Sequence, residues 1–270
     1  MIESNIQTKN KLVRQSFKKI ATERVGETRL NTFGSKMWII EYVSYDNITV
    51  QFENGYIIKT YYGEFIKGKV KNPYNASVFG VGYLGVGDYK TRDEKGHTKQ
   101  YTCWNQMLSR CYSLKVQERQ PTYINCTVCE EWHNFQVFAK WYDENYYELD
   151  GENIALDKDL LNRNNKIYSP STCCFLPHTV NSLLAKSNKS RGSNPIGVTF
   201  NKRASKYYAN CCDGQSNNVY LGSFNSPETA FHTYKKYKES VIKLQAEKYK
   251  NYITKEAYQA LLLYRVYIDD

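Results

Sequence analysis

The chain has 270 residues, of which 41% are hydrophobic and 24% charged, and its formal net charge is +10. No run approaches 18 consecutive apolar residues, which excludes a membrane-spanning helix, and the apolar content excludes a wholly disordered chain. A basic chain with 25 tyrosines favours a polyanionic partner, nucleic acid first, with an ordinary basic enzyme as the alternative. Its first residues do not resemble a secretory signal, so we expect a protein of the cytoplasm, without a membrane partner.

The charge is distributed unevenly. Residues 1–96 carry 15 Lys and Arg against 10 Asp and Glu, residues 97–185 carry 8 against 10, and residues 186–256 carry 13 against 5. The two flanks are therefore basic and the centre is slightly acidic. This distribution predicts polyanion-binding surfaces on the flanks and a centre that could hold a divalent cation.

The N-terminal third is predicted to be a β-rich domain over residues 1–96. Residues 1–25 fit either a loose arm or a short helix. Apolar runs at 38–43, 48–52 and 56–58 are separated by turn residues, including Asn54-Gly55, and predict a small curled antiparallel sheet. The glycine-rich stretch 80–87 is not followed by the Gly-Lys-Ser/Thr of a phosphate loop, so we expect a hairpin with close backbone approach.

The middle of the chain, residues 97–187, opens with two apolar stripes at helical spacing that predict core-facing helices. Their members are Trp104, Met107, Leu108 and Cys111, then Trp132, Phe135, Phe138 and Trp141 or Tyr142. A strand at 154–159, a polar loop at 162–166, a second strand within 168–177 and a helix from His178 follow. Strand, loop, strand and helix form the order of a ββα-metal nuclease element.

The eight cysteines are expected to be thiols rather than disulfides, because no export signal precedes them. Only Cys126 and Cys129 have the spacing of a zinc-ligand pair. A zinc site is therefore the alternative to small buried residues that are chemically inert.

This region resembles the HNH endonucleases and HNH-derived proteins of phages and other mobile elements. The segments that carry the resemblance are Trp104-Asn-Gln-Met-Leu-Ser-Arg-Cys-Tyr112, Cys126-Thr-Val-Cys-Glu-Glu-Trp132, Leu156-Asp-Lys-Asp159 and Tyr168-Ser-Pro-Ser-Thr-Cys173. The resemblance implies metal-assisted hydrolysis of a phosphodiester with a bound divalent cation, Mg²⁺ or Zn²⁺.

The resemblance also implies roles for individual residues. Asp157 matches the metal-binding Asp, and Asn181, or His178 nearby, matches the helix ligand. Lys158 stands where the family has its catalytic His, and Thr172 stands where it has an Asn. An ordinary Lys is protonated at pH 7 and is a poor base, so Lys158 could bind phosphate instead; His133 or His178 is the alternative base.

The C-terminal part, residues 188–270, begins with a polar linker at 188–195 and is predicted to contain three strands and a helix. The strands are expected near 197–200, 207–212 and 217–224, with a basic turn at 202–206. Ser226-Pro227-Glu228 has the residue types of a helix start. A final helix is predicted over Thr254–Tyr267, and it packs on the body or on another subunit.

This part is similar to the Apetala/ethylene-response-factor DNA-binding domain over residues 195–249. The matching strings are Gly197-Val198, Lys206-Tyr-Tyr-Ala209, Tyr220-Leu-Gly-Ser-Phe224 and Glu228-Thr-Ala230. The family lays its sheet in the major groove, and strand alternation would present Tyr208, Asn210, Cys212 and Tyr220 to DNA. Lys202, Arg203 and Lys206 would contact phosphates, whereas Thr199 and Cys212 replace the usual arginines.

Together these observations predict an α+β protein of phage type that binds double-stranded DNA in a bacterial host cell. One hypothesis adds metal-dependent cleavage or nicking by the HNH-like element. The alternative is an inactive accessory protein that binds and inhibits a host protein complex as an anti-defence factor.

Overall fold

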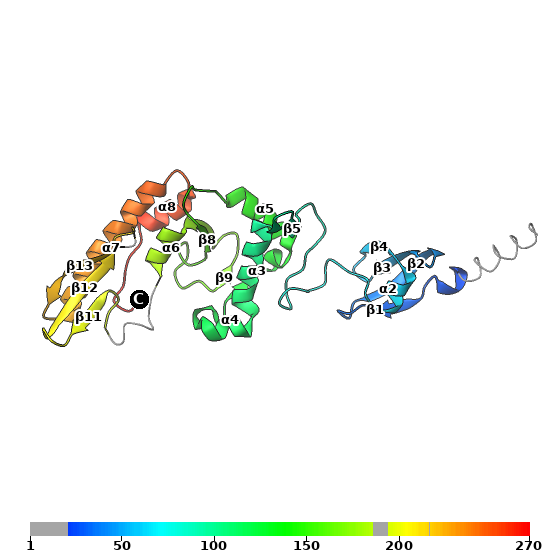
Figure 1. The fold of residues 1–270 in the computed structure, drawn as a ribbon, viewed down its shortest axis with the longest axis horizontal. Coiled ribbons are helices and arrows are strands. Elements are labelled where there is room, and N and C mark those ends of the chain that lie inside the picture. The colour runs from blue at the N-terminus through cyan, green and yellow to red at the C-terminus, as the bar shows by residue number, and fades with distance from the viewer. Residues whose placement is uncertain (1–20, 186–193, 216) are drawn as a thin grey trace, which may run out of the picture. The chain divides into compact units, whose positions relative to one another are not determined.

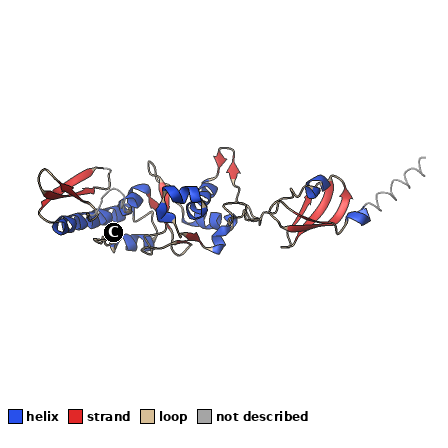
Figure 2. Cartoon of the chain, turned by 90° about the horizontal axis from the view of Figure 1, so that it is seen from below, coloured by secondary structure: helices blue, strands red, loops and turns tan. Residues whose placement is uncertain are grey.

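A computed structural model describes residues 21–185, 194–215 and 217–270 and shows an α+β fold, as expected (Figures 1 and 2). The chain forms two compact units. Unit 1 comprises the residues up to Asp88 together with His133–Gln136, and unit 2 comprises Tyr89–Trp132 and Val137–Asp270. Apart from His133–Gln136, the described residues of the segments predicted as separate domains at 97–187 and 188–270 lie together in unit 2. Among the described helices, none is long and apolar enough to cross a membrane.

Unit 1 is built on a four-stranded antiparallel sheet in which each strand pairs with the next along the chain. The strands are β1 Thr28–Leu30, β2 Lys36–Ser44, β3 Asn47–Phe52 and β4 Ile57–Thr60. Alternate residues face a core that includes Met37, Ile39 and Phe52, which are fully buried. Helix α2, Tyr62–Ile66, closes this core with Phe65. The predicted small antiparallel sheet is confirmed, whereas β1 and α2 were not predicted, because both are too short to show a period.

The glycine-rich segment of unit 1 makes two isolated bridges in place of the expected hairpin: Gly82 pairs antiparallel with Val78, and Tyr83 pairs in parallel with Asn134. Its close backbone approach is present. Gly85 has φ +68°, and a Cβ atom there would lie 2.3 Å from the side-chain oxygen of Asn134. The expected arm at 1–25 lies mostly outside the described residues; residues 21–24 are helical.

Unit 2 begins with short elements around two longer helices that carry the predicted apolar stripes. The elements are β5 Arg92–Asp93, β6 Gly96–His97, α3 Lys99–Tyr112, α4 Leu114–Arg119, η1 Pro121–Tyr123, β7 Thr127–Val128, η2 Glu130–His133 and α5 Phe135–Asn145, the last two of which extend into the 133–136 segment of unit 1. Thr98 caps α3 by accepting a hydrogen bond from the Tyr101 amide. Trp104 and Trp132 are fully buried, and the Trp104 indole donates to the Trp132 carbonyl at 2.7 Å.

The strand–loop–strand–helix order is confirmed. Strand β8, Ile154–Asp157, pairs antiparallel with β10, Cys174–Pro177, and α6, His178–Leu184, follows directly. The second predicted strand is divided, however. Its first part, β9 at Ile167–Tyr168, pairs in parallel with β7, because Ser169–Thr172 form a turn that separates it from β10.

The C-terminal part of unit 2 contains an antiparallel sheet with the order β11-β12-β13. Its elements are β11 Val198–Asn201, β12 Lys206–Cys212, β13 Asn218–Phe224, α7 Pro227–Tyr249 and α8 Lys255–Leu262. Figure 1 shows α7 lying along the sheet. Ser226 caps α7 as predicted, and its side chain accepts a hydrogen bond from the Thr229 amide. Most of the predicted linker at 188–195 lies outside the described residues.

The final helix ends at Leu262, five residues before the predicted end. The chain turns there because Val266 packs into the cluster beneath the C-terminal sheet. The Val266 amide donates to Glu239 at 2.9 Å, and its carbonyl accepts a hydrogen bond from Lys235. Further on, the carboxylate of Asp270 is buried and pairs with Arg163 at 2.7 Å.

Candidate functional site

The C-terminal sheet has one face covered by α7 and one face that carries the predicted DNA-binding side chains. Val198, Ala209 and Cys211 point toward α7 and pack with Phe231 and Tyr234. Residues at alternate positions, Thr199 on β11 and Tyr208 on β12, lie on the other side because successive strand side chains point to opposite faces. We call this side, formed by Thr199, Asn201, Lys206, Tyr208, Asn210, Tyr220 and Ser223, the outer face.

A β-bulge places Tyr220 on the outer face. Ala209 pairs with Gly222 and Asn210 pairs with Tyr220, so Leu221 is the extra residue. Simple alternation from Ser223 would direct Tyr220 toward α7, and the bulge reverses it. The ring of Tyr220 therefore meets that of Tyr208 edge-on at 5.4 Å and is 56% exposed. Gly222 adopts φ +135°, which only glycine reaches without strain.

The basic turn lies at one end of the outer face. Lys202 and Arg203 are exposed in the turn between β11 and β12, and no carboxylate of the described residues forms an ion pair with either. Lys206 opens β12 and donates a hydrogen bond to the Asn225 side chain. All six predicted DNA-binding residues thus lie on the outer face or in its adjoining turn. Cys212, which alternation also placed there, packs instead beside the cluster that contains Val241, because it lies at the end of its strand.

Lys158, at the presumed general-base position, is buried and hydrogen-bonded within its own loop. Lys158 is only 6% exposed, and its amine donates to Asp159 at 2.6 Å and to the carbonyl of Asn165 at 2.9 Å. The Asn165 side chain returns a hydrogen bond to the Lys158 carbonyl at 2.9 Å. This reciprocal arrangement closes the loop between β8 and β9 around the amine. The amine is therefore enclosed by protein groups and does not face solvent.

The neighbouring site residues are also engaged in backbone hydrogen bonds. One carboxylate oxygen of Asp157 accepts from the amides of Asp159 at 2.9 Å and Leu160 at 2.7 Å. Burial raises the pKa of Asp157, and this effect exceeds the lowering by those hydrogen bonds. The Thr172 hydroxyl donates to the carbonyl of Ile167 at 2.7 Å.

The two helix residues lie on α6, which starts at the end of β10. His178 is exposed, and its amide donates to the carbonyl of Asn153 at 2.7 Å. The described structure contains no hydrogen bond between Asn181 and Asp157. Within residues 21–185, 194–215 and 217–270, no group of three or more His, Cys, Asp or Glu side chains is arranged to hold a metal ion. The role of these residues in binding a cation stays a prediction.

All eight cysteines are free thiols, and five of them are buried. Burial raises the pKa of Cys111 to about 12 and that of Cys129 to about 11. Such thiols stay protonated near neutral pH and are poor nucleophiles.

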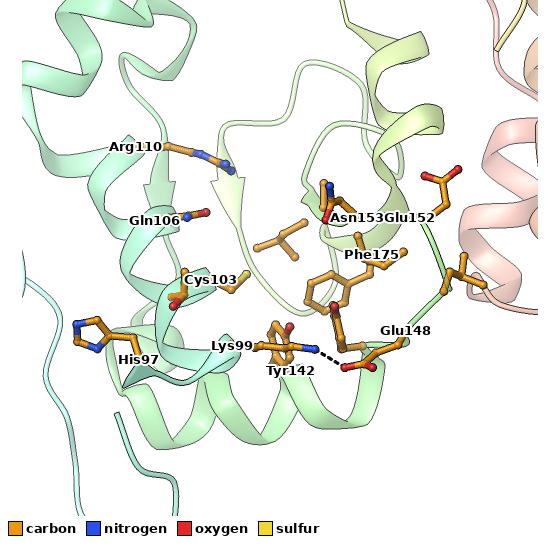
Figure 3. A pocket seen from close by; sticks show the side chains of 16 residues that line it. His97, Lys99, Cys103, Gln106, Arg110, Tyr142, Glu148, Glu152, Asn153 and Phe175 are labelled. Atoms are coloured by element: carbon orange, nitrogen blue, oxygen red, sulfur yellow. Dashed lines mark hydrogen bonds and ion pairs between the residues drawn. The ribbon is translucent and has the colours of Figure 1, made fainter. Parts of the chain in front are cut away.

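Unit 2 also contains a hollow of about 510 Å³ that was not predicted from the sequence (Figure 3). Side chains of α3, the end of α5, the segment 148–153 and strand β8 line it. The α3 wall consists of Lys99, Thr102, Cys103, Gln106 and Arg110, which recur at helical spacing. That polar row beside the apolar stripe on the same helix is the sequence signal that could have identified the wall.

No family model matches this chain, and the comparisons with curated proteins and with solved structures also gave no match.

Proposed function

We propose that this protein binds double-stranded DNA through the outer face of the C-terminal sheet. The observation that carries the proposal is that the six chosen residues, scattered from Lys202 to Tyr220 in the sequence, meet on one face and in its adjoining turn. Phosphates would contact Lys202, Arg203 and Lys206, while Tyr208, Asn210 and Tyr220 would reach the groove.

The composition of the outer face supports affinity more than sequence specificity. Thr199 and Tyr208 lie side by side at its centre. Neither has the guanidinium with which an arginine makes a bidentate hydrogen bond to guanine. Asn210 is the residue suited to a bidentate contact with adenine. The proposal therefore is a reader with strong phosphate dependence and modest base preference.

In this proposal the ββα element supports the fold and does not cut DNA. The amine of Lys158 is enclosed by Asp159 and Asn165, and the Asp157 carboxylate holds two backbone amides. A general base must reach a water molecule near the phosphodiester, and neither group is arranged to do so. Lys158 accordingly serves the β8–β9 loop.

The test measures binding of a fluorescent duplex by anisotropy over a range of salt concentrations, with nicking of supercoiled plasmid in Mg²⁺, Mn²⁺ and Zn²⁺. The sheet variant is Tyr220→Ser. Its matched control is Tyr252→Ser, another exposed tyrosine of unit 2 with one ring neighbour, Tyr147 at 6.3 Å. We expect about a tenfold loss of affinity for Tyr220→Ser, since stacking on one base contributes roughly 1–3 kcal/mol, and no change for the control.

Each other outcome has a definite meaning. Nicking that Asp157→Ala abolishes would replace the binding proposal with the metal-dependent nuclease. Equal losses of duplex affinity in Tyr220→Ser and Tyr252→Ser would show that the outer face is not the binding site. An absence of salt-sensitive duplex binding in the full chain would refute the DNA proposal and favour the host-protein partner.

A further inference from the structure

The hollow in unit 2 lies between α3 on one side and β8 with the segment 148–153 on the other. Figure 3 shows Arg110, Gln106 and Cys103 extending from α3 toward Asn153 and Phe175. Its volume of about 510 Å³ falls within the range of small-molecule sites, roughly 300–1,000 Å³. The hollow is separate from the outer face, because none of its lining residues belongs to β11, β12 or β13.

The carboxylates that line the hollow already have partners. Glu148 forms an ion pair with Lys99, drawn as a dashed line in Figure 3. Glu152 accepts hydrogen bonds from the Tyr249 hydroxyl at 2.7 Å and the Thr179 hydroxyl at 3.2 Å. The negative charge of the lining is therefore largely committed to groups of the protein.

Arg110 is the cation that lacks such compensation. Its guanidinium lies 5.5 Å from the centre of the Tyr123 ring and is hydrogen-bonded to Tyr168, so both partners are phenol side chains rather than carboxylates. No carboxylate among the described residues forms an ion pair with it. A half-buried guanidinium with five donors and no anionic partner attracts a phosphate, whose oxygens it can bind in pairs.

The remaining lining suits a flat ring with polar edges. Tyr142 and Phe175 are buried with ring centres 5.1 Å apart, and the half-buried Tyr146 stacks on Tyr142 at 4.6 Å, so Tyr146 offers the most accessible aromatic surface of the three. Carboxamides stand on opposite walls, Gln106 on α3 and Asn153 before β8. Aromatic surface binds a ring, and a carboxamide pairs with the donor and acceptor that a nucleobase edge presents together.

From this combination we infer that the hollow binds a nucleotide, with its phosphate on Arg110 and its base between the aromatic lining and the carboxamides. Two sources share this chemistry: a free nucleoside monophosphate, and an unpaired nucleotide of bound DNA. The inference goes beyond the proposed function, and the hollow and the outer face have no residue in common.

The first experiment titrates the full chain with the four deoxynucleoside 5′-monophosphates by calorimetry, with the corresponding nucleosides as controls for the phosphate. The second compares a hairpin duplex that has one unpaired nucleotide with its fully paired counterpart. Both use Arg110→Gln and Gln106→Trp. Gln106 is exposed on α3, so tryptophan there fills the hollow without entering the core. The matched control is Arg119→Gln, an exposed arginine on α4 outside the hollow.

We expect Arg110→Gln to weaken nucleotide binding about tenfold or more, since it removes the charged hydrogen bonds to phosphate, and Gln106→Trp to abolish it. Losses for monophosphates identify the free nucleotide as the ligand, and losses only for the unpaired hairpin identify DNA. Binding that both variants retain, or no response in either experiment, overturns the inference. Thermal unfolding verifies each fold, and Gln106→Trp decides if Arg110→Gln fails to fold. Tyr220→Ser should leave monophosphate binding unchanged, which separates this inference from the proposed function.

Discussion

Three basic residues that were assigned functions in unit 2 differ in their exposure: one is buried with hydrogen-bond partners, and the other two are exposed. Lys158 is enclosed by the loop it stabilises, with its amine on Asp159 and on the carbonyl of Asn165. Lys202 and Arg203 stand exposed in a turn with no ion-pair partner among the described residues. Both groups were assigned functions from sequence, but only the second has side chains that an outside partner can reach. A basic residue at a motif position is therefore informative only once its partners are known.

The comparison predicts the largest effect at the enclosed lysine. Lys158→Met keeps the length of the side chain but removes its charged hydrogen bonds and so opens the loop. We expect the free energy of unfolding to fall by about 2–3 kcal/mol. Urea unfolding should show that decrease, while duplex affinity per folded molecule stays unchanged. Lys140→Met, at an exposed lysine paired with Glu144 at 3.9 Å, is the control and should change stability by less than about 0.5 kcal/mol. A stable Lys158→Met that loses DNA binding would reverse the comparison.

Substitutions of the exposed basic residues should lower DNA affinity and leave stability nearly unchanged. The triple variant Lys202→Gln, Arg203→Gln, Lys206→Gln should unfold at nearly the wild-type temperature. Its affinity for duplex should fall about tenfold or more, and the slope of log affinity against log salt should decrease by roughly 0.9 for each phosphate that the variant no longer neutralises. Anisotropy at several salt concentrations measures both quantities. An unchanged slope would show that these side chains do not bind phosphate.

A smaller effect is expected where the outer face depends on backbone geometry. Gly222→Ala introduces a Cβ at φ +135° and 3.1 Å from the Phe224 ring, at a cost of about 1 kcal/mol. Because the bulge directs Tyr220 outward, duplex affinity should fall with stability. Gly151→Ala is the control for both measurements, because Gly151 is another glycine of unit 2 with a positive φ, +76°, and lies outside the outer face. If the two variants behave alike, the bulge does not set the orientation of Tyr220.

The smallest effect concerns Asp157, whose folded pKa is raised by burial. The folded state binds this proton more tightly than the unfolded state, whose pKa is near the ordinary value of 3.8. The stabilising contribution is therefore complete below that value and is lost as the pH rises through the folded pKa. Asp157→Asn keeps an oxygen for the two amides and should remove this pH dependence without loss of stability at pH 7. Unfolding at pH 4 and pH 7, with exposed Asp269→Asn as control, measures it. Destabilisation at pH 7 would show that the negative charge is required.

Local patterns predicted the elements well because they depend on neighbours in the chain. The Asn54-Gly55 turn, the helix cap at Ser226 and the stripe from Trp104 to Cys111 are all legible from spacing and residue type. The early end of α8 could not be predicted from local pattern. It depends on Val266, which packs in one cluster with residues almost seventy positions earlier, such as Val198.

The candidate sites show the same limit. The alternation rule placed Tyr208 and Asn210 on one face correctly, whereas Tyr220 reached that face only through a bulge that no alternation rule contains. Enclosure of Lys158 depends on Asn165, seven residues away across a loop whose course the sequence does not specify. The hollow around Arg110 joins α3 to β8, and long-range contacts of this kind are absent from any local pattern.

The buried carboxylate of Asp270 holds Arg163 at 2.7 Å, and the Arg163 guanidinium lies 3.9 Å from the centre of the Tyr267 ring. Four residues before Asp270, Val266 lies in the cluster beneath the C-terminal sheet. Residues 266–270 therefore tie the loop after Lys158 to the sheet that carries the outer face. We expect the amides of 158–167 and 266–270 to exchange with deuterium as one cooperative unit, so that a change that weakens the packing of 266–270 speeds exchange in both segments.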